Sequence, residues 1–353
     1  MNWIITNFIT NKRNNNIIYG ILFGIILLDF LNDQIHFISQ KYLRIDFSLI
    51  AIFLLIIKWV IHSWYGNIYK KNERIIEKIK ELAKTGSYDE IIKIADKINL
   101  IKPHIAEKKY WLGYANLYKN NNSRKALEYF NGLEKDFPFF AGFFYIKGIA
   151  LIEENRLEEA ITELSRAIEL DENWQNYDQR GVAYLKLEKL ELAEKDLKKS
   201  ISIKEDQSNL NNLGNLYGKQ GKHKEAIELY NKSIELKDDN PNTYYNRALA
   251  NFYLKRFDKA IEDNTKTINL EPNRAWAYYN RALCFQELRK YDLAITDFNK
   301  AENLEIKDKY LYLNRGICKL ENNEKKEGLN DLKKAVGLDC SEASELIKKY
   351  ENK

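Results

Sequence analysis

Proline and cysteine are scarce in this sequence. Only four prolines occur in 353 residues, of which 45% are hydrophobic and 30% are charged. This composition favours long helices over a turn-rich β architecture. The three cysteines, Cys284, Cys318 and Cys340, are too few and too clustered for the disulfide framework of a secreted protein, which favours a reducing compartment.

An excess of one charge sign is also lacking over most of the chain. The formal net charge of +5 divides into +4 for residues 1–71 and +1 for the remainder. Basic and acidic residues are mixed throughout that remainder, so it contains no basic stripe of the kind that binds phosphates. We therefore expect no binding of nucleic acid.

No constellation of residues indicates catalysis. The four histidines are scattered and share no metal-ligand spacing with the cysteines. Residues 218–224 (GKQGKHK) differ from a phosphate-binding loop, because Leu216 replaces its first glycine and His223 replaces its Ser/Thr. We expect no enzyme activity, no cofactor and no metal ion.

Long apolar runs occur near the N-terminus. Residues 17–31 (IIYGILFGIILLDFL) are apolar except for Asp29, and residues 47–65 contain only four polar positions. A membrane-spanning helix needs about 20 predominantly apolar residues, so the second run is long enough and the first is short. We interpret residues 1–71 as a membrane hairpin with residues 32–46 as its turn.

Basic residues flank the open side of this hairpin more densely than its turn. The flanks hold Lys12, Arg13, Lys70, Lys71 and Arg74, whereas the turn holds Lys41 and Arg44. The positive-inside rule then predicts that both ends, and the rest of the chain, are cytoplasmic. The alternative is a soluble protein in which one or both runs are buried helices that cap the N-terminal end of the following array.

A repeat of about 34 residues organises the remaining chain. YYNRALANFYLKRFDKAIEDN begins at Tyr244, and YYNRALCFQELRKYDLAITDF begins at Tyr278. One position, usually small, recurs every 33 to 35 residues: Ile91, Ala126, Ala160, Ala193, Ala226, Ala260, Ala294 and Gly328. Twelve residues before most of these lies a second small residue: Gly148, Gly181, Gly214, Ala248, Ala282 and Gly316. This spacing predicts stacked helix pairs in which small side chains allow close approach.

The pattern resembles the tetratricopeptide repeat (TPR). One unit carries its signature as Leu213, Gly214, Tyr217, Ala226 and Tyr230; another carries it as Tyr278, Ala282, Phe285, Ala294, Phe298 and Ala301. The resemblance implies an all-α fold, a right-handed TPR-type α-solenoid. Eight repeats are expected over residues 72–342, followed by a capping helix over residues 343–353.

Pairs of opposite charge recur within the repeats. Arg180, Arg247, Arg281 and Arg315 are followed sixteen residues later by Asp196, Asp263, Asp297 and Asp331. Where the first position is Lys147 the second is Glu163, and where it is Leu213 the second is Leu229. Because the two positions change together, we predict ion pairs between the two helices of one repeat rather than an arginine clamp for an acidic ligand.

The resemblance implies that the first helices line the concave face. One position there holds an amide row, Asn212, Asn246, Asn280 and Asn314. An amide offers a donor and an acceptor, so this row is predicted to bind the backbone of an extended peptide. Apolar candidates beside it are Tyr245, Leu249, Phe252, Trp276, Tyr279, Leu283 and Tyr310. The alternatives are that the amides only follow the family pattern and that some apolar residues are buried between repeats.

The family also includes clamps for the carboxylate tails of chaperones. Asn215 and Asn246 match such a clamp, but Asn211, Trp276 and Asn280 stand where it needs cations. A carboxylate tail of that type is therefore not the expected ligand.

The sequence thus predicts a membrane-anchored scaffold that binds a partner protein or peptide in its concave groove. The membrane contact is assigned to residues 17–65 and the repeats to the cytoplasm. An alternative is a structural repeat protein that self-associates and has no separate partner.

Overall fold

The chain divides into two compact units, residues 1–138 and 139–353. The computed structural model describes residues 47–98 and 104–351. Over these ranges the regular structure is helical, consisting of α-helices and one 3-10 helix. The expected all-α architecture is therefore confirmed for the described part of the chain.

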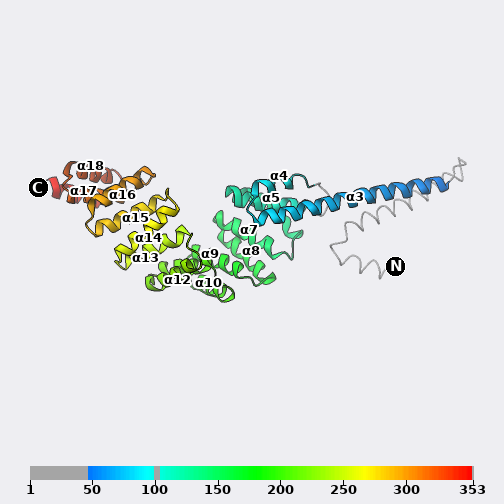
Figure 1. Ribbon diagram of the computed structural model, residues 1–353, viewed down its shortest axis with the longest axis horizontal. Coiled ribbons are helices and arrows are strands. Elements are labelled where there is room, and N and C mark those ends of the chain that lie inside the picture. Colours follow the sequence, from blue (N-terminus) through cyan, green and yellow to red (C-terminus); the bar gives the residue numbers. More distant parts are fainter. Residues whose placement is uncertain (1–46, 99–103, 352–353) are drawn as a thin grey trace. The chain divides into compact units, whose positions relative to one another are not determined.

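The first unit contains two helix pairs. Its helices are α3 (Phe47–Lys84), α4 (Tyr88–Ala95), α5 (His104–Asn120), α6 (Ser123–Phe130) and the 3-10 helix η1 (Leu133–Lys135). The C-terminal half of α3 packs on α4 and α5 (Figure 1). Ile79 and Ile91, which stand where other repeats have small residues, are fully buried in this core.

Helix α3 continues without a break for 38 residues. It joins the second apolar run, residues 47–65, to the first helix of the first repeat. The connecting residues 66–71 (GNIYKK) contain no proline, so nothing there removes a backbone donor and ends the helix. Among the described residues, no helix combines the length and apolar character needed to cross a membrane. The other run, residues 17–31, lies outside the described residues.

A buried histidine connects α5 to α3. His104 is fully buried, and its Nε2 lies 3.1 Å from Oε1 of Glu73 on α3. Its ring also packs against Tyr69, with 4.7 Å between ring centroids. This contact fixes the start of α5 against the long helix.

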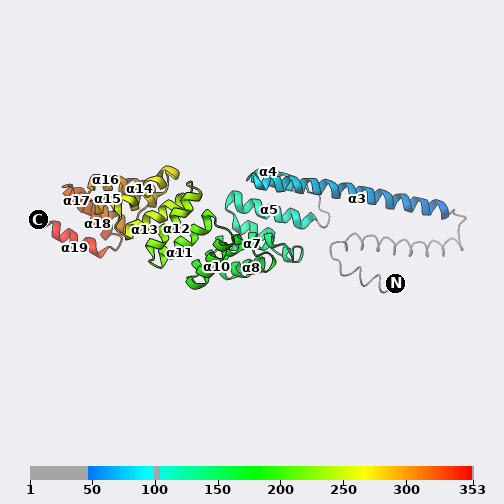
Figure 2. The same cartoon turned by 60° about the horizontal axis from the view of Figure 1, so that its bottom comes forward.

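The second unit consists of six helix pairs and a closing helix. The pairs are α7 (Ala141–Glu153) with α8 (Leu157–Leu170), α9 (Trp174–Lys186) with α10 (Leu190–Ile203), α11 (Gln207–Lys219) with α12 (His223–Leu236), α13 (Pro241–Tyr253) with α14 (Phe257–Leu270), α15 (Ala275–Glu287) with α16 (Tyr291–Asn303), and α17 (Lys309–Glu321) with α18 (Lys325–Val336). The closing helix α19 (Ser341–Glu351) packs on α18 (Figure 2). Successive pairs are in contact from α7 to α18, as expected for a repeat array.

The two helices of a pair approach closely at the small residues. A Cβ atom added to Gly214 would lie 2.6 Å from Cε1 of Tyr230, and one added to Gly148 would lie 2.6 Å from Cγ of Leu164. Such distances leave no room for a larger side chain. The predicted reason for small residues at this position is therefore confirmed.

A left-handed residue stands at the same place in the turn of each pair of the second unit. These residues are Asn155, Glu188, Gly221, Lys255, Arg289 and Asn323. After α13, the backbone N–H of Arg256 donates to the carbonyl of Asn251 at 2.9 Å, which satisfies one of the last helical carbonyls. Glycine adopts this conformation without a steric cost and asparagine tolerates it, so the packing of the pair, rather than local preference, sets the turn at Glu188, Lys255 and Arg289.

The predicted ion pairs are present between the two helices of the repeats that carry charged residues at both positions. The guanidinium groups of Arg180, Arg247, Arg281 and Arg315 each donate two hydrogen bonds to the carboxylates of Asp196, Asp263, Asp297 and Asp331. Lys147 donates to Glu163 at 2.8 Å. The same four arginines also donate to the preceding pair, at Ser165, Asn231, Thr265 and Asn299. Each arginine therefore connects neighbouring repeats as well as its own two helices.

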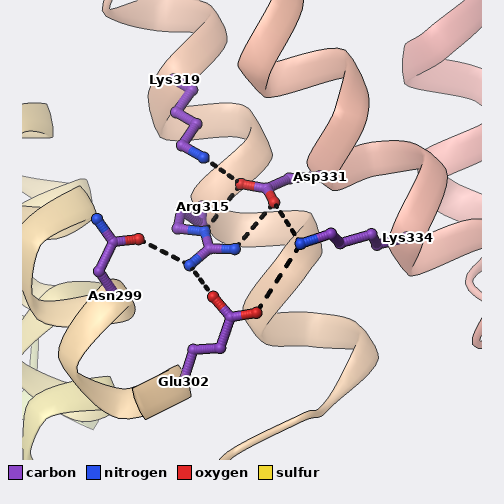
Figure 3. Close-up of polar contacts among 6 residues, drawn as sticks. All are labelled: Asn299, Glu302, Arg315, Lys319, Asp331 and Lys334. Carbon is purple, nitrogen blue, oxygen red and sulfur yellow. Dashed lines mark hydrogen bonds and ion pairs between the residues drawn. The ribbon is translucent and has the colours of Figure 1, made fainter.

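Arg315 forms the largest of these polar clusters (Figure 3). In addition to Asp331, it donates to Oδ1 of Asn299 at 2.7 Å and to Oε2 of Glu302 at 2.5 Å. Lys319 donates to the same Asp331 at 2.7 Å. Burial would raise the pKa of Asp331, but the hydrogen bonds from Arg315 and Lys319 outweigh it and lower that pKa.

Candidate functional site

The first helices of the second unit form a continuous wall. In addition to contacts within pairs, α7 contacts α9, α9 contacts α11, α11 contacts α13, α13 contacts α15, and α15 contacts α17. We call this surface the first-helix wall. It carries the amide row and the apolar candidates, and two neighbouring hollows open along it.

The large hollow has a volume of about 520 Å³ and lies between α11, α12 and α13. Its lining residues are Asn215, Gly218, Lys219, Gly221, His223, Tyr230, Asn246, Leu249, Ala250 and Tyr253. His223 stacks on Tyr253 with 4.8 Å between ring centroids. This site therefore combines aromatic, aliphatic and amide groups within one opening.

The small hollow has a volume of about 180 Å³ and lies between α13, α14 and α15. It brings together four predicted site residues: Leu249, Phe252, Asn280 and Leu283. Ala248, Tyr253 and Asn264 complete its lining. Because Leu249 and Tyr253 line both hollows, the two sites are adjacent along α13.

The four amides of the row differ in their partners. Asn212 Nδ2 donates to Oδ1 of Asp178 at 3.0 Å, and Asn314 Nδ2 donates to the carbonyl of Tyr310 at 2.8 Å. Asn246 Nδ2 donates to Oδ1 of Asn215 at 2.7 Å. Three amide donors are thus engaged within the protein.

Asn280 differs from the other members of the row. Its Nδ2 is buried and has no hydrogen-bond partner in the described part of the chain. An unpaired buried donor destabilises the folded state unless another group supplies an acceptor. Of the four amides, Asn280 is therefore the one whose Nδ2 makes no hydrogen bond to the described residues, which leaves both of its N–H groups for a ligand.

The other predicted apolar residues do not line either hollow. Trp276 and Tyr310 are 50% and 47% exposed. Tyr279 is half-buried and packs edge-on against Phe298, with 5.6 Å between ring centroids. Tyr245 is half-buried beneath the guanidinium of Arg274, 4.3 Å from its ring centroid. Trp276 and Tyr310 thus extend the exposed apolar surface, whereas Tyr245 and Tyr279 are partly used in packing.

Most lining residues of the large hollow were not predicted from the sequence, and Tyr253 and Asn264 are two unpredicted lining residues of the small hollow. Asn264 lies four residues after Ala260, and the same offset holds Phe130, Leu164, Leu197, Tyr230, Phe298 and Leu332 in other pairs. Asn264 could therefore have been identified from the sequence, because it is a polar residue at a position that is apolar in these other pairs. Tyr253 follows directly after Phe252 and is 59% exposed.

A buried carboxyl group lies beside the N-terminal end of the amide row. Asp178 on α9 is 2% exposed and accepts hydrogen bonds from Asn212 and Gln179. Burial raises its pKa to about 6, although the hydrogen bond from Asn212 acts in the opposite direction. The folded state therefore binds a proton at Asp178 at pH values where the unfolded chain does not.

This carboxyl should make stability fall as pH rises from about 4 to about 6, because the folded pKa lies above the unfolded value. We predict that Asp178→Asn removes this dependence and stabilises the protein above pH 6 by about 1–3 kcal/mol. Thermal unfolding of both proteins at pH 5 and pH 8 tests this. The variant should be stabilised relative to wild type more at pH 8 than at pH 5. An equal increase in stability at both pH values would contradict the prediction.

The described residues contain no group of histidine, cysteine and carboxylate side chains suited to hold a metal ion. Cys284, Cys318 and Cys340 are buried and do not form disulfides. Burial raises the thiol pKa of Cys284 and of Cys318 to about 12. These thiols are therefore packed side chains of low reactivity.

The described part of the chain is an all-α helical solenoid built from repeated pairs. Residues 110–176, 175–207 and 277–305 match the tetratricopeptide repeat, and residues 214–254 match the TPR repeat. These segments of the chain therefore match tetratricopeptide repeats, as its sequence pattern predicted. No curated protein matches the sequence.

Two solved structures show a similar fold. The crystal structure of the APC/C hetero-tetramer Cut9-Hcn1 has a TM-score of 0.60 and 18% identity, with 74% of this chain and 52% of that chain covered. The chain thus spans about half the length of that relative. PilF from Pseudomonas aeruginosa has a TM-score of 0.54 and 16% identity, with 60% of this chain and 96% of that chain covered. At these identities, the similarity concerns the fold.

Proposed function

We propose that this protein is a scaffold that holds an extended peptide segment of a partner protein against the first-helix wall between α11 and α15. The observation that carries the proposal is the adjacency of the two hollows, which share Leu249 and Tyr253. Together they offer apolar surface for burial and amide groups for hydrogen bonding along one path. TPR arrays typically perform such protein-binding roles, which supports this reading.

The binding path contains several features of a peptide site. Leu249 is 36% exposed between the hollows, and Tyr253 is 59% exposed beside it. Exposed apolar side chains of this kind bury area on binding, whereas amides bind a backbone without requiring a particular sequence. The cationic side chains that a clamp for a carboxylate tail needs are missing here, because Trp276 and Asn280 stand at two of their places.

Charge placed between the hollows should weaken peptide binding. Peptides that bind the full wild-type chain are first selected from a random library. Their affinities for wild type and for the Leu249→Lys variant are then compared. We expect about tenfold weaker binding by the variant, because an unpaired ammonium group would replace a central apolar contact. The measurement is fluorescence anisotropy of the labelled peptides.

Leu293→Lys is the matched control, because Leu293 is also exposed but lies on α16, a second helix. Its affinity should stay within about twofold of wild type. Failure to select any peptide, or equal binding by both variants, would contradict the proposed site. Light scattering of the same samples would show whether the chain instead associates with itself.

Attachment to a membrane through residues 17–65 is a further part of this proposal, with the repeats in the cytoplasm. It rests on the apolar runs and on the exposure of Phe53, Trp59 and Trp64, which are 63%, 68% and 61% exposed on α3. We expect the full chain to stay in the membrane pellet after alkaline extraction. Its release into the supernatant would favour the soluble alternative.

A further inference from the structure

Asn264 breaks the packing rule of the array. Four residues after the small residue of the second helix, other pairs carry a large buried apolar side chain: Phe130, Leu164, Leu197, Tyr230, Phe298 and Leu332. These side chains fill the space beside the first helix, as Leu197 does next to Gly181. In α14 this place holds an asparagine, and the small hollow opens there.

The asparagine is buried without full hydrogen bonding. Asn264 is 1% exposed, and its Nδ2 donates to the carbonyl of Ala260 at 2.9 Å. Its Oδ1 has no partner among the described residues. A buried acceptor without a donor destabilises a fold, so packing within the pair does not account for this residue.

A second unpaired amide atom lines the same hollow. Asn280 Nδ2 is a donor without a partner in the described chain, whereas Asn264 Oδ1 is an acceptor without one. The walls around them are formed by Leu249, Phe252 and Leu283, together with Ala248 and Tyr253. The volume of about 180 Å³ is roughly six times the share of one water molecule in the liquid, which suits a single side chain.

We propose that the small hollow binds the carboxamide side chain of a glutamine or asparagine in the bound peptide. This inference rests on the proposed function. A primary carboxamide carries two donors and an acceptor on one planar group. Its NH₂ would donate to Asn264 Oδ1, its oxygen would accept from Asn280 Nδ2, and its methylene groups would contact Leu249, Phe252 and Leu283.

Other side chains satisfy the hollow less well. A carboxylate supplies no donor for Asn264, an ammonium supplies no acceptor for Asn280, and an aliphatic group leaves both atoms unpaired. Sites that hydrogen-bond their ligand discriminate strongly against analogues that leave the site's polar groups unpaired. The hollow is therefore a specificity pocket within a path that otherwise binds backbone and apolar groups.

The test is selection of a random peptide library on the full chain, followed by sequencing of the bound peptides. For wild type we expect enrichment of glutamine or asparagine at one fixed position. Replacing that residue by glutamate in a selected peptide should weaken binding at least about tenfold. Asn264→Leu should abolish the carboxamide preference at that position, because the acceptor is gone and the leucine side chain fills part of the hollow.

Asn280→Asp provides a second test by changing the donor into an acceptor. Both polar groups of the hollow then accept, so selection should shift toward lysine or arginine. Asn299→Asp is the matched control, because Asn299 lies on the second helix α16, lines neither hollow, and accepts a hydrogen bond from Arg315 that a carboxylate can keep. The control should keep the carboxamide preference of wild type.

Two results would overturn the inference and are distinguishable. Selection of peptides without a carboxamide preference, or the same preference in Asn264→Leu, would show that the hollow holds only solvent while the scaffold function stands. Selection of no peptides by wild type would overturn the proposed function and the inference together. Circular dichroism of each variant verifies that the repeats are folded during selection.

Discussion

Replacing Arg315 by leucine is expected to destabilise α17 and α18 by about 3–5 kcal/mol. The Arg315 side chain is 4% exposed and bonds Asp331, Asn299 and Glu302 (Figure 3). Leucine would leave Asp331, itself 1% exposed, with only the lysine neighbours as cations. Hydrogen exchange of the backbone amides in α17 and α18 measures the free energy of local opening of these helices. This local measurement is suitable because a repeat array can unfold in several steps, so that one global free energy of unfolding does not describe it.

Arg281→Leu is the matched control for this prediction. Arg281 makes the same two bonds to Asp297, but its side chain is 18% exposed and its third bond goes to the hydroxyl of Thr265 rather than to a carboxylate. The expected loss is smaller, about 1–3 kcal/mol, because Arg281→Leu leaves one carboxylate and a neutral hydroxyl without the guanidinium, whereas Arg315→Leu leaves the carboxylates of both Asp331 and Glu302. Equal losses in both variants would show that the second carboxylate does not decide the contribution of the arginine.

Asn264→Leu is expected to stabilise α13 and α14 by about 1–3 kcal/mol. The substitution removes the unpaired acceptor and restores the apolar side chain found at this place in neighbouring pairs. Phe298 shows that a large residue fits there beside an alanine, because its own partner position is Ala282. Hydrogen exchange of the α13 and α14 amides checks the prediction.

The reciprocal change places the amide in a different pair. Leu197 is fully buried at the equivalent position of α10, and Leu197→Asn should destabilise that pair by about 2–5 kcal/mol. A loss of stability in Asn264→Leu would mean that the asparagine is already satisfied by its surroundings. Asn264 would then not lower the stability of the fold in return for binding a ligand, as we propose that it does.

The repeat and its ion pairs could be predicted because they recur within the chain. Arg247 with Asp263 and Lys147 with Glu163 change together between repeats, so one sequence supplies its own comparison. The contact of each arginine with the preceding pair was not predicted. Its partners, such as Asn231 and Thr265, are short polar groups whose identity varies between repeats.

The amide row shows where a periodic pattern is insufficient. Asn212, Asn246, Asn280 and Asn314 occupy one position, but their hydrogen bonds depend on neighbours that do not repeat. The residue just before the amide position differs from repeat to repeat. A carboxylate such as Asp178 therefore occurs at that place in a single pair. Whether these amides bind a peptide stays a prediction, and the structure distinguishes Asn280 as the one whose Nδ2 has no hydrogen-bond partner among the described residues.

The three cysteines have a practical consequence for studying this array. Cys284 lies on α15, Cys318 on α17 and Cys340 just before α19, and all three are buried. A thiol reagent can modify such a group only after the surrounding repeat has opened. Timed alkylation followed by mass spectrometry would therefore record the order in which the C-terminal repeats come apart, using natural reporters and no added label.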